Sequence, residues 1–179
     1  VGPTTNYWIS GRPTTDNEVE FEDLMMFAVN YNLVSKASSR PAAALSDRLL
    51  LETPATMQAG QVVDARVLLS GTGLIRGLSV ILSWDPLKVE PMSVTPGALA
   101  EANGATVLSA AAGSVDAAVL GTDAGGFTGD GELAVVRFRA LVDGVPGIEV
   151  ASVRGRDMGN HPVTIPCSAT TGVGQLLPT

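Results

Sequence analysis

The side chains that most often perform catalysis are scarce in this sequence. It contains one histidine, His161, which stands between Asn160 and Pro162 as in a surface loop, and one cysteine, Cys167. Nucleophilic catalysis needs a base beside the nucleophile, and a zinc site needs a cluster of His or Cys ligands. Glycoside hydrolysis needs two facing carboxylates, and the acids here are scattered along the chain. We therefore expect no catalytic residues and no enzymatic activity.

A glycine-rich run over residues 121–131 is the segment most similar to a phosphate-binding loop. It lacks the Lys-Ser/Thr ending of such loops, and it leads into a strand pattern rather than a helix. The run therefore predicts a hairpin loop without a phosphate site.

The charge balance argues against two classes of partner. The formal net charge is −7, from 11 basic and 18 acidic residues. Nucleic acids and anionic membrane surfaces both require a cationic footprint, and the sequence has no stretch of about 18 apolar residues that would insert into a bilayer. An acidic surface poor in lysine suits a secreted protein, extracellular or at the cell surface, and its carboxylates suit Ca²⁺.

The apolar residues that must position any binding site fall into two patterns. In the first, Phe21, Leu24, Met25, Ala28 and Tyr31 recur at helical spacing. The opposite side of this helix is apolar too, so it needs cover from more than one direction. Residues 1–34 therefore predict a polar loop followed by a short helix, and the small residues of 35–46 predict a linker.

In the second pattern, short runs of alternating apolar and polar residues follow one another from residue 47 to residue 167. Leu78, Val80 and Leu82, for example, alternate with Ser79 and Ile81. Many short strands between turns indicate a mainly β sandwich, and residues 168–179 read as a C-terminal tail. Strands are expected at 49–52, 63–69, 78–84, 88–94, 106–111, 116–120, 132–141, 148–153 and 163–165, with a helical turn at 98–103.

Three segments of the sandwich, in the same order, resemble a cohesin module. They are Gly60-Gln-Val-Val-Asp-Ala-Arg-Val67, Gly77-Leu-Ser-Val-Ile-Leu-Ser-Trp-Asp-Pro86 and Gly129-Asp-Gly-Glu-Leu-Ala-Val-Val-Arg-Phe138. The resemblance implies a cohesin-like nine-stranded jelly-roll β-sandwich that binds dockerins through one sheet face.

The N-terminal segment resembles one half of a dockerin, whose repeat is an EF-hand-like calcium loop that leads into a helix. The calcium ligands that this resemblance implies are Asp16, Glu18, Glu20 and Asp23. Arg12 and Thr14 occupy loop positions that normally carry acidic or amide ligands, and a cation at Arg12 opposes Ca²⁺. A calcium site and a metal-free turn of the same shape therefore both stay open.

Three functions follow as hypotheses, and none of them is catalytic. In the first, the sandwich is a scaffold module that binds a dockerin-like helix, in cis or head to tail in trans on another copy, as in a filament. The resemblance assigns partner binding to Phe21, Leu24, Met25, Phe27, Ala28 and Tyr31. The second is a carbohydrate-binding module with polysaccharide as its ligand, although Trp84 and Phe138 sit on apolar strand faces. The third is a structural spacer.

Overall fold

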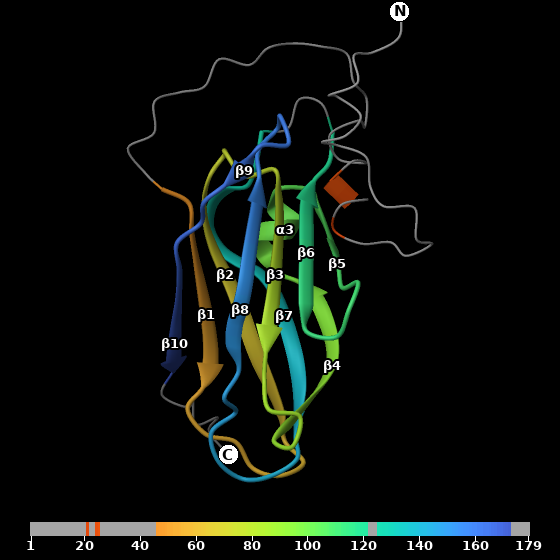
Figure 1. Cartoon of the computed structure of the whole chain (residues 1–179), viewed down its shortest axis with the longest axis vertical. Coiled ribbons are helices and arrows are strands. Elements are labelled where there is room, and N and C mark those ends of the chain that lie inside the picture. The colour runs from red at the N-terminus through yellow and green to blue at the C-terminus, as the bar shows by residue number, and fades with distance from the viewer. Residues whose placement is uncertain (1–20, 22–23, 26–45, 122–124, 173–179) are drawn as a thin grey trace, which may run out of the picture.

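The computed structural model describes residues 21, 24, 25, 46–121 and 125–172 of the chain. These residues form two stacked five-stranded sheets (Figure 1). The first sheet has the order β10-β1-β2-β7-β4 and consists of β1 (Arg48–Pro54), β2 (Val62–Thr72), β4 (Val89–Pro96), β7 (Thr128–Ala140) and β10 (Cys167–Gly172). The second has the order β5-β6-β3-β8-β9 and consists of β3 (Gly77–Ser83), β5 (Ala105–Leu108), β6 (Ser114–Val119), β8 (Glu149–Arg156) and β9 (Pro162–Val163). The short helix α3 (Ala98–Ala102) joins β4 to β5.

The mainly β sandwich expected from the sequence is thus confirmed, with one strand more than expected. Strand pairing is antiparallel throughout the two sheets, except that β10 runs parallel to β1. The strand expected at 163–165 corresponds to Pro162–Val163 beside β8, and the additional strand is β10, which gives ten strands in the described part of the chain instead of nine.

The expected boundary between sandwich and tail at residue 168 is wrong. Cys167 pairs with Leu49, and the pairing continues through Thr171 opposite Thr53 to the end of β10. The side chains of β10 are mostly exposed, so the strand is held by backbone hydrogen bonds and leaves no apolar alternation in the sequence. The sandwich therefore extends at least to Gly172.

The glycine-rich run is only partly a loop. β7 begins at Thr128, so residues 128–131 are paired with β2 and belong to the sheet. Phe127 is fully buried just before this strand. Glycine lowers strand propensity, which explains why the sequence indicates the start of this strand only from Glu132.

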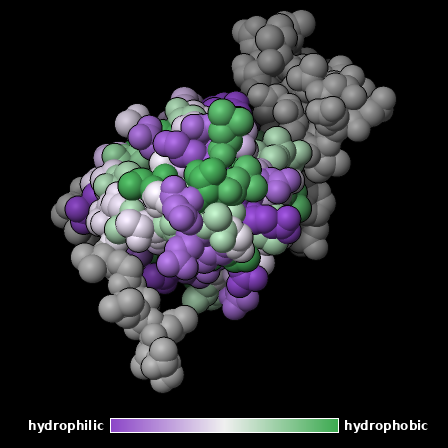
Figure 2. All heavy atoms as spheres, turned by 90° about the horizontal axis from the view of Figure 1, so that it is seen from below, coloured by the Kyte–Doolittle hydropathy of each residue, from purple (hydrophilic) through white to green (hydrophobic). Residues whose placement is uncertain are grey.

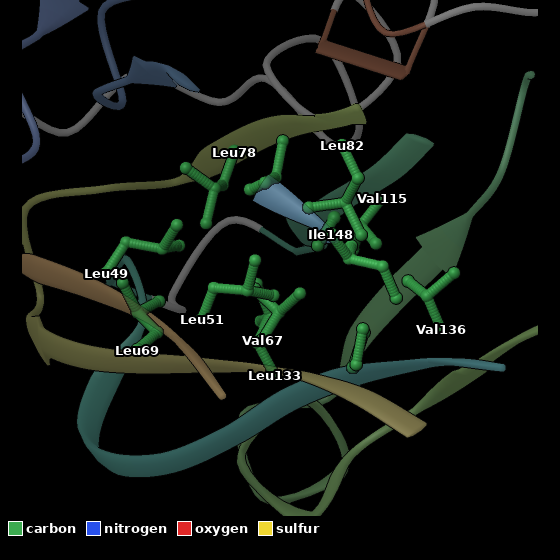
Figure 3. Packing of buried hydrophobic residues seen from close by; sticks show 14 of the residues in the cluster. Leu49, Leu51, Val67, Leu69, Leu78, Leu82, Val115, Leu133, Val136 and Ile148 are labelled. Carbon is green, nitrogen blue, oxygen red and sulfur yellow. The ribbon is translucent and has the colours of Figure 1, made fainter. Parts of the chain in front are cut away.

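The core lies between the inner faces of the two sheets (Figure 3). The alternation seen in the sequence sets these faces, because successive strand residues point to opposite sides. Trp84 packs its ring against Phe138 with centroids 5.4 Å apart and an interplanar angle of 65°. The buried residues of β2 and β3 on this side are Val63, Ala65, Val67, Leu69, Leu78, Val80 and Leu82.

A buried carboxylate fixes the start of the sandwich. Asp47 is 4% exposed, and its Oδ1 accepts hydrogen bonds from the Thr72 backbone N–H at 2.7 Å and from the Thr72 hydroxyl at 2.9 Å. This contact joins the beginning of β1 to the end of β2.

Replacing this carboxylate tests its contribution to stability. We expect Asp47→Ala to lower the free energy of unfolding by about 1–3 kcal/mol, because a buried donor loses its charged acceptor. The measurement is urea denaturation followed by circular dichroism. Asp64→Ala is the matched control, since Asp64 makes only an exposed ion pair of 3.5 Å with Arg137, and it should change stability by about 0.5 kcal/mol or less. Equal losses in the two variants would contradict this role of Asp47.

Candidate protein-binding face

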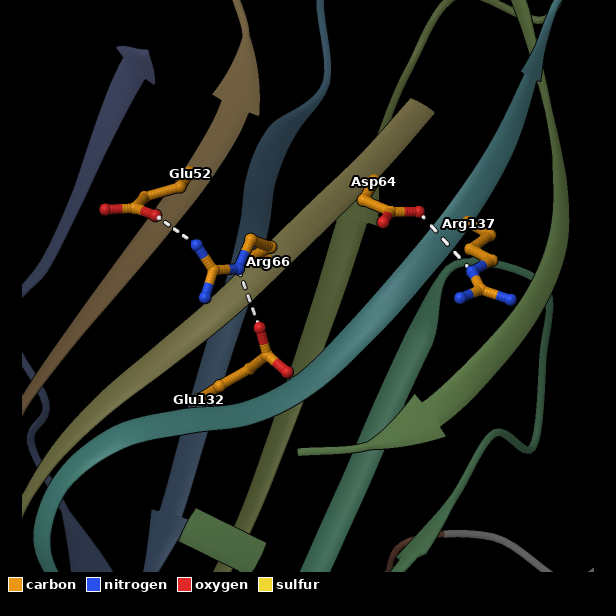
Figure 4. A network of polar contacts seen from close by, with 5 residues as sticks. All are labelled: Glu52, Asp64, Arg66, Glu132 and Arg137. Carbon is orange, nitrogen blue, oxygen red and sulfur yellow. Dashed lines mark hydrogen bonds and ion pairs between the residues drawn. The ribbon is translucent and has the colours of Figure 1, made fainter. Parts of the chain in front are cut away.

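The outer face of the first sheet carries charges that pair with one another across strands (Figure 4). The Nε of Arg66 on β2 donates to Glu132 on β7 at 2.7 Å, and its Nη1 lies 3.4 Å from Glu52 on β1. The hydrogen bond that Arg66 donates to Glu132 raises the pKa of the Arg66 guanidinium. These side chains keep between 23% and 52% of their surface exposed, so the charges of this face are paired with one another and in contact with water.

The outer face of the second sheet differs, because several small residues on its middle strands are buried. Strand register places Gly77 beside Ala118 in one row, and Ser79 between Asp116 and Arg154 in the next. Ala118 is fully buried, and Ser79 and Asp116 are each 3% exposed. Every residue of β6 is buried. A strand buried on both faces must be covered on both, and the first sheet covers only the inner one.

Part of the outer cover comes from the N-terminal segment. Phe21, Leu24 and Met25 have helical backbone and are 5%, 5% and 2% exposed. Leu24 packs against Ala118 of β6, with the partly buried Leu108 and Leu120 around them. In Figure 1 this short helical piece, at the red end of the colour scale, lies beside β6 and β5.

Gly77 provides the closest contact between this segment and the sheet. A Cβ atom at Gly77 would overlap the Sδ of Met25 and lie 2.9 Å from its Cε. Gly77 does not have a positive φ, so its backbone conformation does not require glycine. The missing side chain instead leaves room in the sheet surface for the thioether of Met25.

The third contact involves the aromatic ring of the segment. The guanidinium carbon of Arg154 on β8 lies 5.7 Å from the centroid of the Phe21 ring. A cation over an aromatic face at this distance contributes roughly 0.5–1 kcal/mol. The three apolar side chains thus contact three neighbouring strands: Phe21 on β8, Met25 on β3 and Leu24 on β6.

Comparison with solved structures finds cohesin modules with a fold similar to that of this sandwich. The sixth cohesin of scaffoldin B from Acetivibrio cellulolyticus, solved in complex with a Cel5 dockerin mutant, is 18% identical, with a TM-score of 0.55 over 73% of this chain and 100% of that one. The OlpA cohesin from Clostridium thermocellum, also solved in a cohesin–dockerin complex, is 12% identical, with a TM-score of 0.54 over 72% and 99%. The third ScaC cohesin of A. cellulolyticus, solved in complex with the ScaB dockerin, is 19% identical, with a TM-score of 0.53 over 71% of this chain and 98% of that one.

The fold is that of a cohesin module. The resemblance expected from the three sequence segments is confirmed at the level of the fold. Neither the comparison with protein-family models nor that with curated proteins finds a match to the sequence.

Only some of the residues expected to bind a partner can be placed on this cohesin fold. Phe21, Leu24 and Met25 meet at the outer face of the second sheet, as described above. The other members of the expected helix and the expected calcium ligands lie outside the described residues: Asp16, Glu18, Glu20, Asp23, Phe27, Ala28 and Tyr31.

The strand residues of this face were missed by sequence reasoning. Gly77, Ser79, Ala118 and Arg154 stand at polar or neutral positions of the alternating pattern. The one signal for them is the sequence of β6, Ser-Val-Asp-Ala-Ala-Val, in which the outward positions hold small or short side chains rather than long charged ones.

A second apolar surface lies at the far end of the cohesin-like sandwich. Figure 2 looks onto this end, where apolar side chains gather in the middle and polar ones surround them. The loops that follow β3 and β7 carry the exposed residues Leu87, Leu141, Val142 and Val145. Patches of this kind are common on monomeric proteins, and this one is separated from the Met25 contact by the length of β3.

The other candidate reactive groups are His161 and the carboxylates of the described residues. The Nδ1 of the exposed His161 lies 3.2 Å from Asp157 in the turn after β8. Across the described ranges, no three His, Cys, Asp or Glu side chains stand close enough to hold a metal ion together. No helix in the described part of the chain has the length and apolarity needed to cross a membrane.

The face itself can be tested by filling the space at Gly77. We expect Gly77→Met to expose the N-terminal segment, because the new side chain needs the volume that Met25 occupies. Chymotrypsin should then cleave after Phe21 at least about tenfold faster, as followed by mass spectrometry, because cleavage requires the segment to leave the face. The control is Val62→Met, which adds the same side chain on the half-exposed outer face of the first sheet. Unchanged protection in Gly77→Met, with both variants folded, would contradict the contact.

The lone cysteine gives a prediction about reactivity. Cys167 is exposed at the start of β10, yet partial burial raises the pKa of its thiol. Since the thiolate is the nucleophile, the fraction of reactive thiol at pH 8 should lie below that of free cysteine. We expect slower reaction with Ellman's reagent than glutathione shows at the same pH. A faster reaction would indicate an activated thiol.

Proposed function

We propose that this chain is a non-catalytic protein–protein interaction module. In this proposal, the outer face of β5, β6, β3 and β8 holds an apolar, dockerin-like helix. The observation that carries the proposal is the burial of β6 on its outer side, where Leu24 packs on Ala118 and Met25 lies over Gly77.

The dimensions of the face suit a helix that lies across the strands. Neighbouring strands lie about 4.7–4.9 Å apart, and helix residues three or four positions apart lie about 5–6 Å apart. One helix face can therefore place successive side chains on successive strands, as Phe21 and Met25 are placed on β8 and β3. Gly77 and Ala118 let the helix approach closely.

Two further observations support the proposal, the first for a protein partner and the second for the face. The cohesins of similar fold from A. cellulolyticus and C. thermocellum were solved with dockerins bound. The opposite outer face, by contrast, carries the exposed ion pairs of Arg66 and Arg137, and binding an apolar helix there would remove these charges from water at a cost.

The source of the bound helix has two versions. In cis, the helix comes from the same chain. In trans, it comes from the next copy, and repetition of such a head-to-tail contact builds a filament. We further propose secretion to the cell exterior or cell surface, and Ca²⁺ binding by Asp16, Glu18, Glu20 and Asp23 ahead of the helix. The acidic composition favours both proposals.

The carbohydrate-binding alternative is not favoured by the aromatic residues of the sandwich. Sugar-binding faces use exposed aromatic rings as stacking platforms. Phe127 and Phe138 are fully buried, and Trp84 packs with its edge against Phe138. These are the three aromatic residues between positions 46 and 172.

The proposed function can be tested with a variant whose own segment is disabled. The double variant Leu24→Asp/Met25→Asp, here called the open-face variant, should leave the sandwich folded and its face free. We expect it to bind a fluorescein-labelled peptide of residues 14–34 with a Kd on the order of 10 μM, as measured by fluorescence anisotropy. The peptide carries all six helix residues proposed to bind a partner, and about 1.5–3 kcal/mol for each large apolar one, less the cost of association, leads to this range.

Two controls make this test specific to the face. The same peptide with Asp at positions 24 and 25 should not bind. Gly77→Met, added to the open-face variant, should abolish binding, whereas Val62→Met should leave it unchanged. If both peptides bind equally well, or neither binds, the proposed helix-binding function is wrong.

A further inference from the structure

The face described above already holds a ligand in the folded chain. Phe21, Leu24 and Met25 are each at least nine-tenths buried against it. Met25 occupies the space that Gly77 leaves, and an outside helix with the same anchors would need that same space. Internal and external helices are therefore mutually exclusive at Gly77.

The length of chain between Met25 and Asp47 permits the contact with Gly77 within one molecule. Asp47, where the sandwich begins, is bound to Thr72, and Met25 lies over Gly77. Thr72 and Gly77 are five positions apart, so these two anchor points are separated by at most about 18 Å of chain. Residues 26–45 join Met25 to the sandwich, and twenty residues can span up to about 70 Å when fully extended. The tether is thus long enough to make the contact without being stretched.

A tether of this length gives the internal helix a large concentration advantage. When a linker matches the distance that it spans, the effective concentration of the attached ligand reaches the millimolar range. For a helix with a Kd of about 10 μM, an effective concentration of about 1 mM fills the face in roughly 99 of 100 molecules. The apparent affinity of a competing helix then falls by about a hundredfold, because only the unoccupied fraction can bind it.

We propose that Phe21, Leu24 and Met25 form a built-in ligand that occupies the helix-binding face in cis and competes with outside partners. This inference rests on the proposed function. When the protein concentration is below the millimolar range, the segment therefore binds in cis in most molecules, and docking onto another copy is rare. The inference also defines the partner: an α-helix with an aromatic residue three positions before a Leu-Met pair, with the ring placed under Arg154 and the methionine over Gly77.

The experiment compares the full-length chain with the open-face variant, using the labelled peptide of residues 14–34. We expect the unmodified chain to bind the peptide about a hundredfold more weakly than the open-face variant. A difference below about threefold would overturn self-occupancy and leave the helix-binding function intact. Failure of the open-face variant to bind would overturn the proposed function, and the inference with it. The two failures are therefore distinguishable.

The solution mass of the unmodified chain provides a second test of occupancy in cis. Light scattering should give the monomer mass from about 1 μM to about 100 μM, because the tether outcompetes neighbouring copies over this range. A mass that rises with concentration in the unmodified chain, and stays monomeric in the open-face variant, would show that the segment docks on neighbours and would overturn occupancy in cis.

Discussion

Strands β3 and β6 impose the constraint on which the rest of this structure depends, because several of their outward residues are buried as completely as the inward ones. Ala118 and Gly77 offer the solvent almost no polar side-chain surface, and Asp116 is nearly buried. The first sheet covers only one side of these strands. An apolar partner must therefore cover the other side, and the first 25 residues of the chain supply three side chains that do so.

The outer face of the first sheet carries paired charges instead of buried small residues. Cross-strand ion pairs around Arg66 and Arg137 keep that surface polar without long apolar gaps. Each exposed pair contributes little to stability. The contrast between the two outer faces is the reason for proposing that a partner binds the second sheet, while the shared inner core accounts only for the stacking of the two sheets.

Alternation between apolar and polar residues was enough to predict the sandwich core, because strands such as β2 alternate strictly along their inner side. The same rule missed β10, whose polar side chains pair only through the backbone. It also missed the candidate binding face. Gly77 and Ala118 are far apart in the sequence, and only the pairing of β3 with β6 brings them side by side. Helical spacing did pick out Phe21, Leu24 and Met25, because helix faces are local in sequence whereas strand neighbours are not.

The energy of the internal contact is small enough for exchange to matter. Burying one large apolar side chain stabilises by about 1.5–3 kcal/mol, and fixing one residue of backbone costs about 1–2 kcal/mol. For Phe21, Leu24 and Met25, the gain from burying three side chains exceeds the cost of fixing their backbone by only a few kcal/mol. Such a segment stays on its face chiefly because the tether holds it close. A free helix that brings one or two additional anchors, for instance against the partly exposed Ile81 farther along β3, would have enough affinity to displace it.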